Sequence, residues 1–276
     1  MASNDVRRLL LKTAGLLVPA VSAAAFAPAP GMNRQAPLRI AFGDATPPLY
    51  WKTREDSTHD VEGMCVDLMA ELARLLDARF EASVYPLPRV QTLVEVGAVD
   101  GMVNVLTPER LAYSIATRQA LFQDRISIFV HRDSPYLKRL QAVRTLDDLA
   151  RTGVTVLSLI GAGWTRRNLE SRGMKVYFGT GTGGEVKMLI GRRGDVVVDM
   201  STNVNWWLKK LPGSENIVEL PGKLDMIKWY LLIGKRSPFA QRMPELEQAL
   251  QHLQASPRYK AILNKHGLNG GRMAPA

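Results

Sequence analysis

The chain is poor in cysteine and histidine, the residues that build disulfides and many metal centres. It has a single cysteine, Cys65, among 276 residues, which excludes an internal disulfide. Because Cys65 falls in an apolar helical pattern, we interpret it as a small packed residue and not as a nucleophile. The histidines show no metal-ligand spacing; they are His59, His131, His252 and His266. We therefore expect no metal site and no cofactor.

No apolar run long enough to span a membrane occurs after residue 30. The one long uncharged apolar run, residues 13–27, follows Arg7-Arg8-Leu9-Leu10-Leu11-Lys12 and ends in small residues. This is the pattern of a secretory signal, and its paired arginines resemble a twin-arginine export signal; an ordinary secretory signal is the alternative. We expect a signal peptide over residues 1–27, a linker over residues 28–37, and a soluble, exported mature chain in the periplasm.

Positive charge is abundant but not concentrated. The formal net charge is +10, yet the sequence has no lysine-rich or arginine-rich run and no basic stripe interleaved with aromatic residues. Proteins that bind nucleic acids gather their positive charge in such patches, so we expect no nucleic-acid partner. The excess of positive charge is consistent with an anionic ligand or partner, and equally with a role in solubility.

Apolar periodicity indicates an α/β protein built from two similar units. In the first unit, strands and helices alternate, at residues 38–42, 64–76, 80–85, 90–96 and 99–105. Strands of the second unit are predicted at residues 125–131, 154–159, 175–178 and 196–199. A further strand and two terminal helices are predicted at residues 229–233, 238–254 and 257–265. Alternating strands and helices imply a mostly parallel sheet with helical crossovers. We expect one lobe from residues 38–122 and 228–276, and a second lobe from residues 123–227.

Arg110 is the clearest candidate for a binding group. A short apolar run leads into Thr107-Pro108-Glu109-Arg110. Thr107 is a helix N-cap candidate, and Pro108 suits the first helical turn, where its missing N–H is not needed. The Arg110 guanidinium then lies beside free backbone N–H groups, a combination that binds anions and especially planar carboxylates. The alternative is a solvated arginine that pairs with Glu109 or Asp124.

Six short segments follow one another in the order found in a known family. They are the strand and Pro-Pro-aromatic loop of residues 38–51, Gly63-Met64-Cys65-Val66-Asp67-Leu68, Gly97-Ala98-Val99-Asp100, Thr107-Pro108-Glu109-Arg110, Thr145-Leu146-Asp147-Asp148-Leu149 with Gly153-Val154-Thr155-Val156, and Arg193-Gly194-Asp195 leading to Asp199. In these segments the chain resembles extracellular solute-binding family 3, the periplasmic solute-binding proteins of the amino-acid-transporter type, over nearly all of residues 38–267. The resemblance implies an α/β, periplasmic-binding-protein-like type II fold. In this fold two lobes joined by two crossing strands close on a ligand by a hinge motion.

The resemblance also implies a binding site at the carboxyl ends of the strands. Arg110 matches the arginine that holds the ligand α-carboxylate, and Asp199 matches the acid that receives the ligand amino group. The other implied ligand-binding residues are Asp44, Tyr50, Trp51, Asn104, Thr107, Gly161, Ala162, Gly163 and Trp164. The implied function is capture of an amino acid or related carboxylate by a monomer, for delivery to the membrane permease of an ABC importer.

The chain departs from the family pattern at the second-lobe helix start. Residues Gly161-Ala162-Gly163-Trp164 lack the hydroxyls that usually help to hold the carboxylate, although the backbone N–H groups there would still face it. The strand before Thr107 is also about two residues shorter than the family pattern. These departures affect the identity of the ligand more than they affect the fold.

Three other functions are open from the sequence. The glycines of residues 179–184 spell the dinucleotide motif G-x-G-x-x-G, with Asp199 where a ribose-binding acid would fall, but the motif comes late and its helix is short. The family includes periplasmic enzymes such as cyclohexadienyl dehydratases; no carboxylate or histidine stands out as an acid or base, so we expect no catalytic residue and no enzyme activity. A ligand-sensing protein on the same fold is the third alternative.

Overall fold

The computed structural model describes residues 36–43, 46–159, 163–180 and 183–268. Three predicted site residues, Asp44, Gly161 and Ala162, lie outside these residues. The predicted signal peptide, residues 1–27, also lies outside them, so its prediction stays untested.

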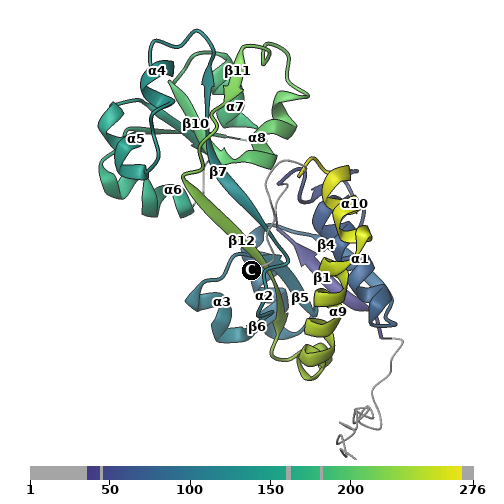
Figure 1. Cartoon of the computed structure of the whole chain (residues 1–276). Coiled ribbons are helices and arrows are strands. Elements are labelled where there is room, and N and C mark those ends of the chain that lie inside the picture. The colour runs from purple at the N-terminus through teal and green to yellow at the C-terminus, as the bar shows by residue number, and fades with distance from the viewer. Residues whose placement is uncertain (1–35, 44–45, 160–162, 181–182, 269–276) are drawn as a thin grey trace, which may run out of the picture. The chain divides into compact units, whose positions relative to one another are not determined.

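The described residues form a ten-stranded sheet in the order β4-β1-β5-β12-β7-β10-β8-β9, with β6 beside β12 and β11 beside β7 (Figure 1). Its strands are β1 Leu38–Phe42, β4 Phe80–Val84, β5 Gly101–Asn104, β6 Ser114–Ala116, β7 Phe122–His131, β8 Val156–Leu159, β9 Val176–Gly179, β10 Val196–Met200, β11 Ile217–Glu219 and β12 Asp225–Gly234. A separate hairpin pairs β2 Trp51–Lys52 with β3 Val61–Glu62.

The long strands β7 and β12 connect two halves of this sheet. They pair antiparallel from Phe122 opposite Trp229 to Ile126 opposite Asp225. Beyond this ladder, β12 pairs with β5 and β6, and β7 pairs with β10 and β11. We call β4, β1, β5 and β6 the first half of the sheet, and β10, β8, β9 and β11 the second half. The lobe boundaries expected after residues 122 and 227 fall in the ladder, and they stay a prediction.

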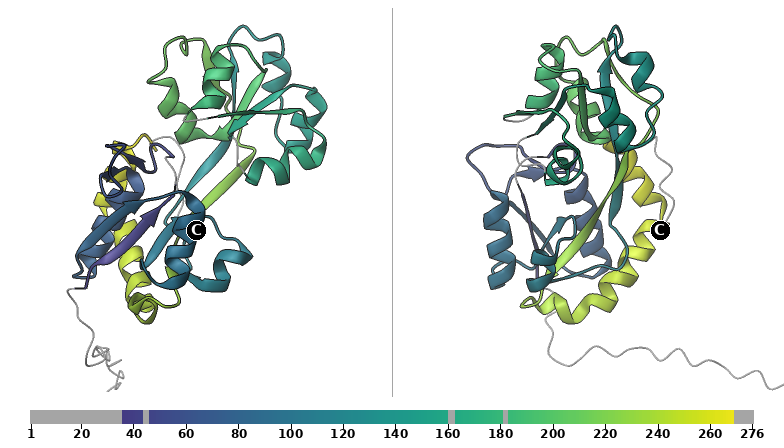
Figure 2. Two further views of the ribbon diagram at one scale, coloured as in Figure 1. Left: turned by 180° about the vertical axis from the view of Figure 1, so that it is seen from behind. Right: turned by 90° about the vertical axis from the view of Figure 1, so that its left-hand side faces the viewer.

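Helices cover both halves. Beside the first half lie α1 Met64–Leu75, α2 Leu87–Val96, α3 Pro108–Tyr113, α9 Met243–Ala255 and α10 Pro257–Lys265. Beside the second half lie α4 Leu137–Leu140, α5 Leu146–Thr152, α6 Gly163–Asn168, α7 Gly184–Ile190 and α8 Ser201–Leu208. Single 3-10 turns occur at Glu170–Arg172 and Pro238–Arg242. Helices α9 and α10 pack against α1 (Figures 1 and 2), so the chain returns to its first unit, as the sequence suggests.

Each half has apolar cores on both faces of its strands. In β10, Val196 and Val198 enter one core while Val197 enters the other, because successive side chains of a strand point to opposite faces. In the first half, Cys65 is fully buried in the core beneath α1. Burial raises the pKa of its thiol well above the usual value. The prediction of a small packed cysteine is confirmed by its full burial.

The strand ends differ from the predicted ones where polar residues are paired in the sheet. Strand β7 begins three residues before the predicted start at residue 125, and β12 begins four residues before the predicted start at residue 229. The added segments carry Asp124 and Lys228, which apolar periodicity does not detect. The predicted helix over 238–254 is divided into a 3-10 turn and α9, which begins at Met243.

One glycine fixes the loop that precedes β2. Gly63 has a φ of 137°, and a Cβ there would lie 2.4 Å from the Leu49 carbonyl oxygen. This close approach lets Met64 N–H donate to the Pro48 carbonyl and Cys65 N–H donate to the Leu49 carbonyl, both at 2.9 Å. The first free amides of α1 therefore hold the Pro-Pro-aromatic loop in place.

Candidate functional site

Arg110 is buried at the start of α3, with 9% of its surface exposed. Thr107 caps the helix by accepting a hydrogen bond from the Arg110 N–H at 3.3 Å, and Pro108 occupies the first turn, so the predicted cap is confirmed. The side chain folds back to the end of β5, where Nη1 donates to the Val105 carbonyl at 2.8 Å. Its Nε is buried without a hydrogen-bond partner among the described residues.

The surroundings of Arg110 contradict the interpretation that it is a solvated surface arginine. No described carboxylate forms an ion pair with Arg110. Glu109 takes part in no ion pair within the described part of the chain, and the Asp124 carboxylate accepts hydrogen bonds from Arg125 and Thr202 instead. Burial lowers the pKa of Arg110, chiefly by removing water from the charged guanidinium. A buried guanidinium with an unused Nε donor is a group that an incoming anion would stabilise.

Asp199 lies at the carboxyl end of β10, opposite Ser127 of β7. One of its carboxylate oxygens, Oδ1, accepts a hydrogen bond from the Met200 N–H at 2.7 Å. Burial, with a smaller contribution from the nearby charge of Asp124, raises the pKa of Asp199 to about 6. A cationic group beside Asp199 would lower that pKa and stabilise the carboxylate.

Two further buried carboxyls near Asp199 were not predicted as site residues. Asp124, in β7, is 3% exposed and its carboxylate bonds to Thr202 and to the Arg125 N–H. Burial raises the pKa of Asp124 to about 6 despite those hydrogen bonds. Glu185, in α7, is 1% exposed, and its Oε2 has no hydrogen-bond partner among the described residues. Burial and the charge of Asp199 raise the pKa of Glu185 to about 7.

Gly179 explains how Glu185 comes to this position. A Cβ at Gly179 would lie 2.3 Å from the Glu185 backbone nitrogen, so only glycine lets the start of α7 approach the end of β9 this closely. The glycine run at 179–184 thus acts, over its described residues, as a close strand-to-helix crossover. The glycines are recognisable in the sequence, but no local pattern predicts that Glu185 is buried.

The two predicted pocket aromatics diverge. Tyr50 is 3% exposed and packs on Phe42, with ring centroids 5.3 Å apart, and on Trp229 at 6.5 Å. Trp51 is half-buried, and its ring lies 5.9 Å from that of Trp206 in α8. The structure therefore places Tyr50 in the core of the first half, whereas Trp51 contacts a helix of the second half.

A hydrogen bond accompanies this aromatic contact. The Asn203 amide Nδ2 donates to the Pro47 carbonyl oxygen at 3.0 Å, which ties α8 to the Pro-Pro-aromatic loop a second time. Neither Asn203 nor Trp206 was predicted as part of the site. Both residues lie in α8, the helix that follows Asp199. Helix α8 therefore contacts the Pro-Pro-aromatic loop, in which part of the predicted site lies.

The remaining predicted residues lie at strand and helix ends. Asn104, at the end of β5, is 7% exposed, and its Oδ1 accepts a hydrogen bond from the Val105 N–H at 2.8 Å. Gly163 is the first residue of α6. The Trp164 indole Nε1 donates to Asp225 Oδ2 at 2.6 Å, which fixes the indole against β12 instead of leaving it as a free wall of the pocket.

The described residues contain no group of three or more histidine, cysteine or acidic side chains arranged to hold a metal ion. Within the same residues, no helix has the length and apolar character needed to cross a membrane. The structure has a buried cation at the end of β5, which suits a carboxylate, and a carboxylate at the end of β10, which suits a cationic group.

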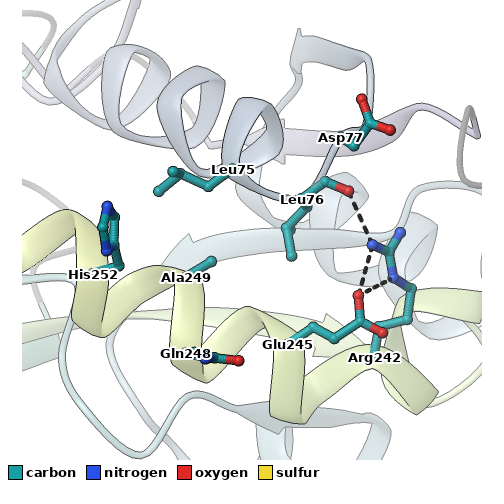
Figure 3. A pocket seen from close by; sticks show the side chains of 8 residues that line it. All are labelled: Leu75, Leu76, Asp77, Arg242, Glu245, Gln248, Ala249 and His252. Carbon is teal, nitrogen blue, oxygen red and sulfur yellow. Dashed lines mark hydrogen bonds and ion pairs between the residues drawn. The ribbon is translucent and has the colours of Figure 1, made fainter. Parts of the chain in front are cut away.

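A groove of about 460 Å³ lies elsewhere, between α1 and α9 (Figure 3). Its lining residues are Leu75, Leu76, Asp77, Arg242, Glu245, Gln248, Ala249 and His252. Within it, Arg242 donates to Glu245 and to the Leu76 carbonyl. None of the predicted site residues lines this groove, so we do not count it as part of the site.

The fold matches solved structures along almost the whole of each chain. An ancestral arginine-binding protein bound to arginine is similar at a TM-score of 0.64 and 18% identity, covering 85% of this chain and 99% of that one. The substrate-binding protein of an amino acid ABC transporter is similar at 0.62 and 16% identity, covering 85% and 100%. A histidine kinase sensor domain with similarity to periplasmic binding proteins is similar at 0.66 and 16% identity, covering 86% and 98%. These likenesses confirm the predicted α/β, periplasmic-binding-protein-like type II fold.

Among curated protein sequences, none matches the chain. A family description does match it, that of the bacterial extracellular solute-binding proteins, family 3, over residues 38–269. The match spans both halves of the sheet and the two terminal helices. The chain therefore belongs to the bacterial extracellular solute-binding proteins, family 3.

Proposed function

We propose that the protein captures an amino acid or a related carboxylate in the periplasm and delivers it to the permease of an ABC importer. The observation that carries the proposal is the buried Arg110 guanidinium, whose Nε has no hydrogen-bond partner among the described residues. Arg110 suits the carboxylate of a zwitterion, and Asp199 suits its ammonium group. The amino-acid-binding structures that share the fold support this ligand class.

The ligand is held by closure of two lobes, residues 38–122 with 228–276 and residues 123–227. Two observations support this division. The strands β7 and β12 are the long elements common to both halves of the sheet, and separate apolar cores lie in each half. The protein acts as a monomer, without a cofactor and without catalysis of its own.

The direct test is a ligand screen on the mature chain. A thermal-shift panel of amino acids, dicarboxylates, polyamines and nicotinamide cofactors identifies the ligand class, because a ligand at 100 times its Kd adds about 2.7 kcal/mol to the free energy of unfolding. Calorimetry then gives the Kd for the wild type and for Arg110→Ala. We expect at least one amino acid or carboxylate to bind. Stabilisation by a dinucleotide alone would contradict the proposal.

Arg110→Ala should weaken the binding of that ligand by about 30-fold or more, since truncating one partner of a buried charge pair costs about 2–5 kcal/mol. Arg132→Ala is the matched control, because it removes the same charge from an exposed position. Circular dichroism and the ligand-free Tm show whether each variant folds. If both variants are folded and bind the ligand with equal affinity, Arg110 does not contribute to ligand binding.

A further inference from the structure

Arg167 lies over the first residue of α6. A Cβ built on Gly163 would meet the Arg167 Nη1 at 3.1 Å and its Cζ at 3.9 Å. The guanidinium therefore lies beside the amino-terminal end of the helix. This is the segment in which the sequence lacks the hydroxyl side chains of the family pattern.

Unlike its arginine neighbours, Arg167 forms no ion pair with any described residue. Arg166 pairs with Glu170 at 3.9 Å, and Arg172 pairs with Asp147 at 2.9 Å. The Arg167 side chain has no hydrogen bond and no ion pair within the part of the chain that the structure describes. Arg167 is exposed, so its charge is available to a ligand.

Arg167 and Arg110 belong to different halves of the sheet, Arg167 in α6 and Arg110 in α3. Helices α6 and α3 project to the same side of the β7–β12 ladder in all three views (Figures 1 and 2). The two guanidinium groups are within electrostatic range: burial is the main cause of the lowered pKa of Arg110, and the positive charge of Arg167 lowers it further. Arg167 also acts on the carboxylate of Glu109, the residue before Arg110.

The two guanidinium groups repel each other, and although the Glu109 charge attracts both, it forms an ion pair with neither among the described residues. Arg110 is nine-tenths buried and keeps an unused Nε donor, and Arg167 offers a second unused fork of N–H groups. A carboxylate has two oxygens and about four lone-pair positions, enough to accept from both guanidinium groups at once. An anion placed between them would remove the repulsion and satisfy both sets of donors.

We propose that Arg167 is a second anion-binding residue, which shares the ligand carboxylate with Arg110. This inference rests on the proposed function and deepens it. Arg167 supplies from the second half of the molecule the donors that hydroxyl side chains would otherwise give at the start of α6. Contact with one carboxylate from both halves also links recognition of the acid group to closure. The site therefore requires a free carboxylate and rejects the corresponding amide or methyl ester.

The test compares Arg167→Ala with Arg166→Ala, which removes the same charge from the adjacent position of the same helix. Calorimetry with the amino acid or carboxylate found in the screen should show about tenfold weaker binding for Arg167→Ala, the loss of one charge-assisted hydrogen bond. Arg166→Ala should stay within about twofold of the wild type, and Arg167→Lys should fall between. The wild-type Kd should also rise more steeply with salt than that of Arg167→Ala. Equal affinities of the two alanine variants would overturn the inference while leaving the proposed function intact.

If the wild type binds no member of the panel, the proposed function fails. Measurements of the Tm of the ligand-free variants still test the role of Arg167. At low ionic strength, Arg167→Ala should raise the Tm relative to Arg166→Ala, because it relieves the repulsion with Arg110. That difference should vanish in an Arg110→Ala background and at high salt. A Tm difference that is absent, or that is the same in both backgrounds, would show that the two guanidinium groups do not share one anion site.

Discussion

Thr202 donates both its backbone N–H and its hydroxyl to the same carboxylate oxygen, Oδ2 of Asp124. The N–H contact measures 3.2 Å. Asp124 lies in the ladder that connects the two halves of the sheet, and Thr202 lies in the first turn of α8. The start of α8 is thus fixed to the strand that joins the halves, directly after Asp199.

Thr202→Val should lower the free energy of unfolding by about 1–3 kcal/mol, because it leaves a buried carboxylate oxygen without its hydroxyl donor. The loss should be larger above pH 6 than at pH 4, since the pKa of Asp124 is about 6 and only the ionised form needs that donor. Urea denaturation at both pH values measures the effect. Thr92→Val, at an exposed position of α2, is the control. An equal loss at both pH values would show that packing, and not the hydrogen bond, is what Val disturbs.

The stability of the ligand-free protein should fall as the pH rises from about 4.5 to about 7. Burial and Asp199 raise the pKa of Glu185 from 4.5 to about 7, so the unfolded chain releases this proton at lower pH than the folded chain does. The contribution of Glu185 is therefore complete below pH 4.5 and is lost as the pH passes 7. Asp199 and Asp124 act with the same sign up to about pH 6.

Glu185→Gln tests this pH dependence. The variant should be more stable than the wild type at pH 8, by up to about 3 kcal/mol, and no more stable at pH 4. Glu215→Gln, at an exposed position, should not change the profile. Urea denaturation across this pH range gives the measurement. A wild-type stability that is flat from pH 4 to pH 8 would show that the Glu185 carboxyl is not held in a desolvated state.

Removing the contact between Trp51 and Trp206 should weaken ligand binding, even though Trp206 is not a predicted ligand-binding residue. An aromatic pair contributes about 0.5–1.5 kcal/mol beyond the area that it buries, so Trp206→Ala should raise the Kd by up to about tenfold. Trp206→Phe keeps a ring and should recover most of the affinity. Calorimetry gives the Kd, and stopped-flow fluorescence should assign the change to faster release. If the Tm falls but the Kd does not change, the contact stabilises the ligand-free and the ligand-bound forms equally.

The export route is testable at the paired arginines of the predicted signal. Changing both Arg7 and Arg8 to Lys keeps the positive charge that an ordinary secretory signal needs, but removes the pair that twin-arginine export reads. We expect the full-length chain to stay in the cytoplasm after this change and to reach the periplasm without it. Cell fractionation, with amino-terminal sequencing of the exported form, gives the result. Undiminished export of the double-lysine variant would identify an ordinary secretory signal.

The sequence determined the features of this protein that depend on neighbouring residues. The Thr107-Pro108 cap needs only a hydroxyl and a proline at adjacent positions, and the structure confirms it. The alternation of strands and helices, and the order of the six family segments, likewise follow from residues close together in the chain. These local patterns were enough to predict the family and the fold before any contact was known.

Only the tertiary structure decided which charges are buried and what they face. Glu185 and Arg167 lie in ordinary helical sequence, and the charged groups with which they interact, Asp199 and Arg110, come from other segments of the chain. Trp51 and Tyr50 are adjacent in the sequence, yet Trp51 contacts α8 and Tyr50 packs in the core of the first half. The free energy of a charge depends on the water and the charges around it, and those surroundings are assembled from distant segments.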